Sequence, residues 1–324
     1  MPERTLKPWP YTPAPQLVAD TGGTNTRVAL ADSGVLRQGS IRRYANAEYP
    51  SLAAVLQDYL RHTATTECAG VCVGIAGPVE GDRAEMTNLN WVITAAELGA
   101  VAGTRKVKIL NDLQAQGHAL AALDPRHVRP LLPGRPAPAG AAQLVVGAGT
   151  GVNAAPVHYL AGGVHVAASE CGHIHLPVHG EQEQALARHM AHHDGVAMAE
   201  EALCGRGLTM IHAWVSGQTL PPETVIAAIA AGDHAALETG QIYARLMGRV
   251  LATLALVHLP YGGIYLIGGV ARAMAPRLIG LGMGEAFHQM GRFSDFMQGF
   301  AVHVVEDDYA ALLGCATHLT ALPD

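Results

Sequence analysis

The sequence has few cysteines and no pairing pattern among them. Its 324 residues include 5 cysteines, which are widely scattered and show no CxxC spacing. An odd number without paired spacing argues against a disulfide framework and against a thiolate zinc site. The pattern predicts a protein that works in a reducing cytoplasm.

Positive charge is also scarce. Lysine and arginine together number 21, against 27 aspartate and glutamate residues, so the formal net charge is -6. A chain with this balance has no basic footprint for a polyphosphate backbone such as DNA. We therefore expect no nucleic acid partner.

Long apolar runs are missing. No stretch approaches the roughly 20 apolar residues that span a bilayer, so we expect no membrane partner. Residues 1–15, "MPERTLKPWPYTPAP", are rich in proline and lack an apolar segment. They predict a flexible N-terminal leader rather than a signal peptide.

The sequence does contain one kind of segment twice, as "LVADTGGTN" from Leu17 and as "LVVGAGTGVN" from Leu144. In the first, the apolar runs 17–20 and 27–31 predict two strands joined by a tight turn. Rossmann and Walker phosphate loops pass from a strand into a helix instead, and neither glycine signature follows these turns. Each segment therefore predicts a hairpin with a glycine-rich tip.

The rest of the chain predicts an α/β fold. Apolar patterns indicate helices over 50–62, from near 113, over 236–259 and over about 308–322, and strands over 71–76, 107–110 and 261–271. Since single cores stop growing near ~250 to 300 residues, we expect two lobes. The Pro- and Gly-rich stretch 132–141 predicts a surface loop. We expect a small α/β domain over 16–110 plus about 305–324, and a large α/β domain over 111–304.

Glycine-rich turns can bind phosphate, because backbone N–H groups without a neighbouring Cβ approach an anion closely. For either turn taken singly, a tight hairpin that needs a positive φ explains the glycines equally well. Asp20 adds to the phosphate reading, since a carboxylate beside a phosphate needs a cation such as Mg²⁺ between them. Gly268 and Gly269 predict a flat surface for a nucleoside. The candidate nucleotide-binding residues are Asp20, Thr21, Gly22, Gly23, Thr24, Asn25, Gly147, Ala148, Gly149, Thr150, Gly151, Gly268 and Gly269.

A series of segments extends these motifs from about Gln16 to Leu322: "DTGGTNTRVAL", "GIAGPVEGDRAEMTNLNW", "ILNDLQA", "GAGTGVNAAPV", "SECGH", "EEALCGRGL", "GGIYLIGGVA" and "LLGCATHL". In content and order they resemble the bacterial ATP-dependent glucokinases, within the superfamily of sugar kinases, actin and heat-shock chaperones. The resemblance implies a two-lobed actin-like ATPase (ribonuclease H-like) fold with a cleft between the lobes. It also implies transfer of phosphate from ATP, with Mg²⁺, to the 6-hydroxyl of glucose in glycolysis, by a cytoplasmic homodimer.

Asp112 is the candidate general base. Phosphoryl transfer to an alcohol needs a group that accepts the hydroxyl proton, and Asp112 follows a strand at the edge where α/β folds bind ligands. The alternative is a helix N-cap ahead of "LQAQGHALAAL". The resemblance favours the base, because the family's catalytic aspartate follows an asparagine in this strand.

The resemblance also assigns the sugar contacts. They are Asn111, Asp112, Glu170, His173 and Glu200, with Asn88 expected close by. Glu201 competes with Glu200, and counting back from "LCG" favours Glu200. His173 and His175 are expected to alternate along a strand and so to point the same way.

One loop departs from the family pattern. The sequence has "ASECGH" where relatives usually have "PGEGGH", so Ala168, Ser169 and Cys171 replace a proline and two glycines. The acid and the imidazole are kept, but the loop geometry and the selection of the sugar are put in question. Cys171 is either a small apolar filler or an oxidation-sensitive thiol beside the substrate.

Other functions are weighed against this one. His189, His192 and His193 would share a helical face, but a solvated helix explains them better than a metal site. The cysteine cluster that binds zinc in the related repressor, open reading frame and kinase (ROK) group is missing. A kinase acting on another hexose or using polyphosphate stays open. A sugar-sensing regulator is disfavoured, because only a short Pro-rich segment precedes the first hairpin.

Overall fold

Strands and helices alternate through the chain, and the predicted α/β class is confirmed. The computed structural model describes residues 13–86 and 89–323, apart from the side chains of residues 193 and 194. The chain divides into two compact units. The first ends at Ala115 and takes up the last segment, from Tyr309, and the second comprises Gln116–Asp308.

The first unit is built on a mixed sheet. Its central strands β1 (Gln16–Thr21), β5 (Gly70–Ile75) and β9 (Val107–Asn111) are parallel, and β2 (Asn25–Asp32) pairs antiparallel with β1. The strand order is β3-β2-β1-β5-β9, with β3 (Val35–Leu36) and β4 (Arg42–Ala45) both paired to β2. A small antiparallel sheet contains β6 (Val79–Glu80), β7 (Arg83–Glu85) and β8 (Val92–Thr94).

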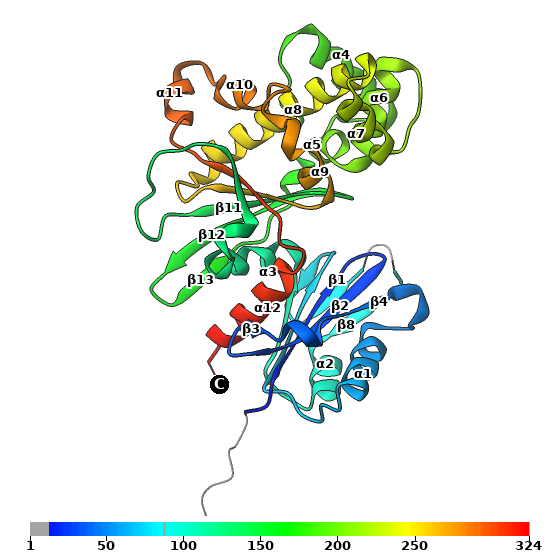
Figure 1. Ribbon diagram of the computed structural model, residues 1–324, viewed down its shortest axis with the longest axis vertical. Helices are drawn as coiled ribbons and strands as arrows, with labels where there is room; N and C mark the ends of the chain where they lie inside the picture. Colours follow the sequence, from blue (N-terminus) through cyan, green and yellow to red (C-terminus); the bar gives the residue numbers. More distant parts are fainter. Residues whose placement is uncertain (1–12, 87–88, 324) are drawn as a thin grey trace, which may run out of the picture. The chain divides into compact units, whose positions relative to one another are not determined.

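Alternation along β1 places apolar side chains on both faces of this sheet. Leu17 packs into the core that α1 (Leu52–His62) and α2 (Ala95–Ala102) close on one face. Val18 packs into the core formed by α12 (Ala310–Ala321) on the other face. The helices of this unit therefore cover a sheet that is buried on both sides, as the apolar strands predict (Figure 1).

The second unit repeats this strand arrangement. Its order is β10-β15-β14-β11-β12-β13, in which β11 (Gln143–Ala148), β14 (Ile264–Ile267) and β15 (Val302–Val305) are parallel. The antiparallel neighbours are β12 (Val152–Leu160), β13 (Gly163–Val166) and β10 (Val128–Leu132). The path β13-β12-β11-β14-β15 matches β3-β2-β1-β5-β9 in order and direction. The two glycine-rich segments are thus the first hairpins of two similar sheets.

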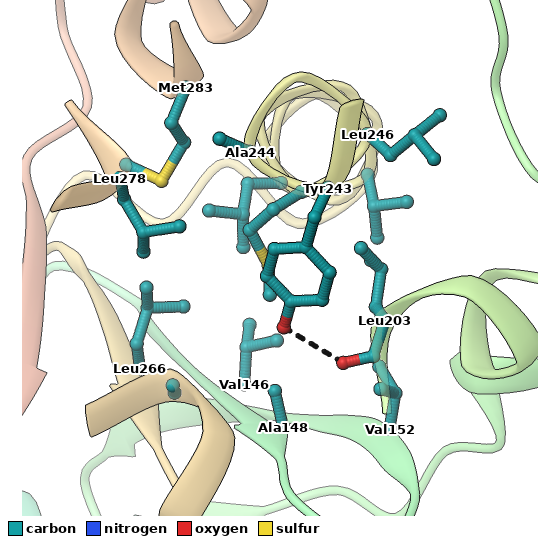
Figure 2. Packing of buried hydrophobic residues seen from close by; sticks show 14 of the residues in the cluster. Val146, Ala148, Val152, Leu203, Tyr243, Ala244, Leu246, Leu266, Leu278 and Met283 are labelled. Carbon is teal, nitrogen blue, oxygen red and sulfur yellow. Dashed lines mark hydrogen bonds between the residues drawn. The ribbon is translucent and has the colours of Figure 1, made fainter. Parts of the chain in front are cut away.

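The helices of the second unit surround α8 (His234–His258), which is the predicted long core helix. Figure 2 shows Tyr243 of α8 among apolar side chains, with its hydroxyl donating to the Leu203 carbonyl at 2.9 Å. The hydrogen bond satisfies the polar end of a fully buried ring. The other helices are α4 (Gly180–Asp194), α5 (Ala199–Leu203), α6 (Gly205–Ser216), α7 (Pro222–Ala231), α9 (Gly269–Leu278), α10 (Met283–His288) and α11 (Ser294–Met297).

Short helices connect several elements. Helix α3 (Asp112–Ala119) follows β9 directly. The 3₁₀ turns are Gln38–Ser40, Asn46–Glu48, Leu120–Ala122, Pro125–His127, Cys171–His173 and Gly291–Phe293. Among the described residues, no helix has the length and apolar character needed to cross a membrane.

Two predicted strands are wrong in part. The strand predicted over 261–271 ends at Ile267, and residues from Gly269 are helical, because Gly268 turns the chain with a φ of 98°. His173 and His175 do not alternate along a strand: His173 ends the 3₁₀ turn Cys171–His173, and His175 forms an isolated bridge with Met198. Their side chains therefore do not share the predicted face.

A buried ion cluster joins α4 to α8. The carboxylate of Glu183, 2% exposed, accepts from Arg245 Nε at 3.0 Å and from Arg249 Nε at 2.9 Å. It also accepts from the backbone N–H of His179 at 2.8 Å. Removing one member of such a cluster leaves the opposite charges buried without compensation.

We therefore expect Glu183→Ala to lower the free energy of unfolding by about 3 kcal/mol. Glu181→Ala is the matched control, since Glu181 is exposed on the same helix, and its effect should stay within about 0.5 kcal/mol. Urea denaturation of both variants measures the difference. Equal midpoints for the two would show that the cluster contributes nothing to stability.

Candidate active site

The first glycine turn is held by a buried asparagine. Asn46, 2% exposed, donates from Nδ2 to the Gly22 carbonyl at 2.7 Å and accepts from Thr26 Oγ1 at 2.8 Å. The backbone N–H of Asn46 also donates to the Thr24 carbonyl at 2.9 Å. These hydrogen bonds hold the backbone of the turn on its buried side, while the tip of the turn faces solvent. No sequence motif marks Asn46 as part of the site.

Positive φ does not explain the glycines of either turn. In the part of the chain that the structure describes, the glycines with positive φ do not include Gly22, Gly23, Gly149 or Gly151. Both segments are tight hairpins, but the explanation that their glycines are needed for a positive φ is wrong. Close approach explains one of them, because a Cβ at Gly151 would lie 2.6 Å from Glu200 Oε2. Gly22 has ordinary space around it, so its missing side chain leaves backbone open to a ligand.

The predicted base lies on the same sheet edge as the first glycine turn. In register, Thr21 of β1 pairs with Ile75 of β5, and Ile75 pairs with Asn111 of β9, so three parallel strands end together. Hydrogen bonds link the segments that follow: Ala76 N–H donates to the Thr21 carbonyl at 3.0 Å, and Asn111 Nδ2 to the Gly77 carbonyl at 3.2 Å. The carboxyl edge of a parallel sheet is where α/β folds bind ligands.

Asn111, and not Asp112, is the residue that caps α3. Asn111 Oδ1 accepts from the Leu113 N–H at 3.0 Å, and Gln114 Oε1 accepts from the Asn111 N–H at 3.1 Å. This reciprocal pair is a capping box with Asn111 at the N-cap. Asp112 stands at the first helical position, half-buried, and its Oδ1 also accepts from the Leu113 N–H at 2.8 Å. The positive end of the helix favours the ionised carboxylate.

Asp20 pairs with a cation supplied by the chain. Its Oδ2 lies 3.2 Å from Arg27 Nη1, across the antiparallel pair of β1 and β2. Burial raises the pKa of Asp20, and the nearby guanidinium of Arg27 acts in the opposite direction. A desolvated carboxylate gains from a nearby positive charge, and it is the kind of oxygen ligand that Mg²⁺ takes. In the described part of the chain, no three His, Cys, Asp or Glu residues are grouped as a metal site.

Glu200 joins the second glycine turn to the loop that departs from the family pattern. Its Oε2 accepts from the Val152 N–H at 2.8 Å, just after the turn. A Cβ at Gly172 would lie 3.3 Å from the Glu200 Cβ and 1.9 Å from the Val152 carbonyl oxygen. The turn, the loop and Glu200 are therefore packed tightly together, and glycine is required at position 172. Among the described residues, no hydrogen bond of this kind involves the Glu201 side chain.

Glu170 and His173 lie on the exposed side of the same loop. Their side chains are 70% and 59% exposed, and His173 Nδ1 is 3.9 Å from Glu170 Oε2. Cys171 between them is 9% exposed, and burial raises the pKa of its thiol. A buried thiol of raised pKa is poorly reactive, so the apolar-filler interpretation of Cys171 is favoured over the oxidation-sensitive one.

A cavity of about 810 Å³ lies within the second unit, beside the second glycine turn. Its wall includes Gly149 and Thr150 and the first residues of three helices: Gly205 of α6, Pro222 of α7 and Gly269 of α9. Among the described residues, no side chain caps these three helix starts. The Gly205 N–H of α6 donates to the Gly149 carbonyl at 2.9 Å, and Glu223 in the first turn of α7 also lines the cavity. The start of α9 therefore presents its positive end to the cavity with the fewest competing acceptors. Among the described residues that line the cavity, Arg206 is the one lysine or arginine.

The remainder of the wall is largely apolar and includes Met210, Ala213, Ile226 and Ala273. A cavity with positive backbone ends on one side and apolar side chains on another suits a phosphate-bearing heterocycle. Gly268 shapes the boundary between β14 and α9, since a Cβ there would lie 2.4 Å from the Ala148 carbonyl oxygen.

The predicted residues thus fall into two groups. The first unit contains the sheet edge with Asp20, Thr21, Asn25, Asn111 and Asp112 and the turn between β1 and β2. The second unit brings Glu170, His173 and Glu200 to the second glycine turn, with Gly147 and Ala148 ending β11 and Gly269 starting α9. Asn88 lies outside the described residues.

Known proteins resemble the chain over nearly its whole length. A family model described as Glucokinase matches residues 17–322. A glucokinase of Stenotrophomonas maltophilia (strain R551-3) is 33% identical over 319 residues, which cover 94% of both chains. A crystal structure of glucokinase from an Antarctic psychrotroph has a TM-score of 0.84 at 26% identity and covers 95% of this chain and 99% of that one.

A second structural match supports the fold alone. Glucokinase from Balamuthia mandrillaris, solved in complex with glucose, has a TM-score of 0.77 at 18% identity and covers 95% of this chain and 93% of that chain. These matches confirm the actin-like ATPase fold that the motifs imply.

Proposed function

Because the chain belongs to the glucokinase family, we propose that it transfers the γ-phosphate of ATP to the 6-hydroxyl of glucose. The predicted family and the predicted class of enzyme, a kinase of this family, are confirmed by the matches. The donor, the attacked hydroxyl and the role of each residue are proposals. We also propose a cytoplasmic homodimer, as the family resemblance implies, and light scattering on the purified protein tests the dimer.

One observation carries this proposal most directly. Asp112 and the first glycine turn occupy the same carboxyl edge of three parallel strands, Thr21, Ile75 and Asn111 being in register. A carboxylate and a phosphate-binding turn on one edge are the two parts that phosphoryl transfer to an alcohol requires. Asn111 supplies the capping box of α3, and Asp112 follows it at the first helical position.

In the proposed reaction, the carboxylate of Asp112 accepts the proton of the sugar 6-hydroxyl while the hydroxyl oxygen forms a bond to the γ-phosphorus. The bond between that phosphorus and the oxygen bridging to the β-phosphate breaks, and ADP leaves with the electron pair. Asp112 must be ionised to act, and its place at the first position of α3 favours that state.

We propose that the second unit supplies most of the sugar contacts. Glu170, His173 and Glu200 present acceptors and a donor around the second glycine turn, and a hexose selected by paired hydrogen bonds needs both. Asn111 and Asn88 stay proposed contacts. Both the Oδ1 and the Nδ2 of Asn111 already have hydrogen-bond partners within the first unit. A sugar that binds Asn111 would therefore share these two atoms with those partners.

The nucleotide is proposed to bind in the cavity of the second unit. The helix starts and the second glycine turn would face its phosphates, Arg206 would add positive charge, and the apolar wall would receive the adenine. The tip of the first hairpin is proposed as a phosphate-binding turn of the first unit. Mg²⁺ bound with the nucleotide would neutralise phosphate charge, and Asp20, which pairs with Arg27 in the free protein, is proposed as the carboxylate facing the ion.

The direct test is glucose-dependent release of ADP from ATP and Mg²⁺ by the purified protein. A panel of mannose, fructose and polyphosphate as alternative substrates separates glucokinase from a kinase of other specificity. Release that requires glucose supports the proposal. An enzyme inert with every hexose and donor in the panel would disprove it.

Filling the cavity should affect only the nucleotide. Ala213→Trp places a large side chain in the wall of the cavity from α6, and overfilling a packed site costs roughly 1–3 kcal/mol. We expect KM for ATP to rise at least about tenfold, with KM for glucose little changed. Ala230→Trp is the control, because Ala230 is exposed on α7 and is absent from the wall. An unchanged KM for ATP in Ala213→Trp would place the nucleotide elsewhere.

A further inference from the structure

Asn153 holds three successive residues of the loop that contains Glu170. It is the second residue of β12, directly after the second glycine turn and opposite Gly147. Its Nδ2 donates to the Ser169 carbonyl at 2.5 Å and to Glu170 Oε2 at 3.2 Å. Its Oδ1 accepts from the Cys171 N–H at 3.0 Å. One amide therefore joins the strand to the loop backbone and to the Glu170 carboxylate.

Ser169 and Cys171, two of the residues by which the loop departs from the family pattern, pack and hydrogen-bond with the strand around Asn153. Ser169 Oγ donates to the Ala154 carbonyl at 2.7 Å and lies 3.4 Å from Asn153 Oδ1. The thiol of Cys171 is buried beneath the same stretch of strand. A serine and a buried thiol in the loop, with an asparagine in the strand, supply contacts that the glycines of the family's usual loop cannot make.

The Glu170 carboxylate depends on this amide for its orientation. Its side chain is 70% exposed, and its other polar neighbour in the loop, His173, is 3.9 Å away. A glutamate this exposed samples many rotamers unless a hydrogen bond selects one. The donated hydrogen bond of Asn153 Nδ2 is such a restraint.

The loop backbone has a second anchor that does not involve Asn153. Gly172 packs so closely on the Val152 carbonyl and on Glu200 that no side chain fits there. On the other side of Glu170, Ser169 Oγ donates to the Ala154 carbonyl at 2.7 Å. Residues on both sides of Glu170 would therefore stay near the strand if the Asn153 amide were removed. The carboxylate would lose its orientation while the loop kept its place.

We infer that Asn153 is a positioning residue that holds Glu170 in the orientation in which the carboxylate binds the sugar. The inference rests on the proposed function, in which Glu170 contacts glucose. It accounts for how a loop without the family's usual glycines can still present its acid to the substrate.

Two variants separate the two ends of the amide. Asn153→Asp keeps an oxygen that can accept from the Cys171 N–H but replaces the donor to Glu170 with a repelling carboxylate. Asn153→Ala removes both the acceptor oxygen and the donor nitrogen. We expect KM for glucose to rise at least about tenfold in both variants, with kcat and KM for ATP within about twofold of the wild type. His158→Ala, a change near the far end of the same strand, is the control and should leave KM for glucose unchanged.

A merely structural role would give a different pattern. It would lower the melting temperature and would disturb both substrates alike. The double variant Asn153→Ala with Glu170→Ala is the sharper test: if Asn153 acts through Glu170, it should be no worse for glucose than Glu170→Ala alone. Additive losses in the double variant would overturn the inference.

The outcomes also distinguish this inference from the proposed function. If the wild type phosphorylates glucose and folded Asn153→Asp keeps the wild-type KM, the inference alone is wrong. If the wild type neither binds nor phosphorylates any hexose, the proposed function is wrong and the inference is wrong with it.

Discussion

The Asp112→Asn variant is expected to bind glucose nearly as well as the wild type while losing at least ~10²-fold in kcat. Asparagine keeps the size and the hydrogen-bonding oxygen of the side chain but cannot accept a proton near neutral pH. Its Oδ1 can still accept from the Leu113 N–H, as the aspartate does at 2.8 Å. Helix α3 should therefore start at the same residue, and the loss should fall on the chemical step.

Steady-state kinetics and glucose titration by intrinsic fluorescence measure the two effects separately. Gln114→Ala is the matched control, because Gln114 completes the capping box around Asn111 without offering a base. It should reduce stability by roughly 1 kcal/mol and change kcat little. Near-normal turnover in Asp112→Asn, or a comparable loss in Gln114→Ala, would mean that Asp112 is not the base.

The second large effect is expected at Glu200, and its neighbour provides the control. Glu200 accepts from the Val152 N–H at 2.8 Å and touches both the second glycine turn and the loop at Gly172. Glu200→Ala removes a proposed sugar contact and leaves the Val152 N–H without that acceptor. Since hydrogen bonds to charged groups contribute roughly 1.5–3 kcal/mol, we expect kcat/KM for glucose to fall about 10²-fold.

Glu201→Ala changes the same kind of residue one position later in α5. From the sequence, Glu201 competes with Glu200 as the sugar-binding glutamate, yet the second glycine turn packs on Glu200. We expect kcat/KM for glucose within about threefold of the wild type in Glu201→Ala. Glu200→Gln, which keeps an oxygen for the Val152 N–H, should restore stability more than activity. A larger loss at Glu201 than at Glu200 would reverse the assignment.

The pattern of apolar residues was enough to predict the main elements. Several elements occur where the apolar periodicity places them. They are the two hairpins, the strand before Asn111, helix α1 and the 25-residue helix α8. Local propensity decides these elements, since their apolar residues repeat at the period of a strand or a helix. The strand over 261–271 was predicted too long because Gly268, with its φ of 98°, ends it. A positive φ depends on the surrounding structure and cannot be read from one glycine.

Asn46 and Asn153 could not have been predicted from the sequence. Each is a single polar residue outside any spacing rule, and each acts through partners 15 or more residues away, as Asn46 does on Gly22 and Asn153 on Ser169. The capping role of Asn111 was open to prediction, because glutamine follows it by three residues.

The sequence by itself determined the α/β class, the repeated glycine hairpin and the family, because each depends on residue types in a fixed order along the chain. Tertiary structure alone decided which carboxylate packs on the second turn and what requires glycine at position 172. It also decided which residue caps α3 and which amide orients Glu170. These are matters of distance between residues remote in the chain, and only the packing of the sheets and helices sets such distances.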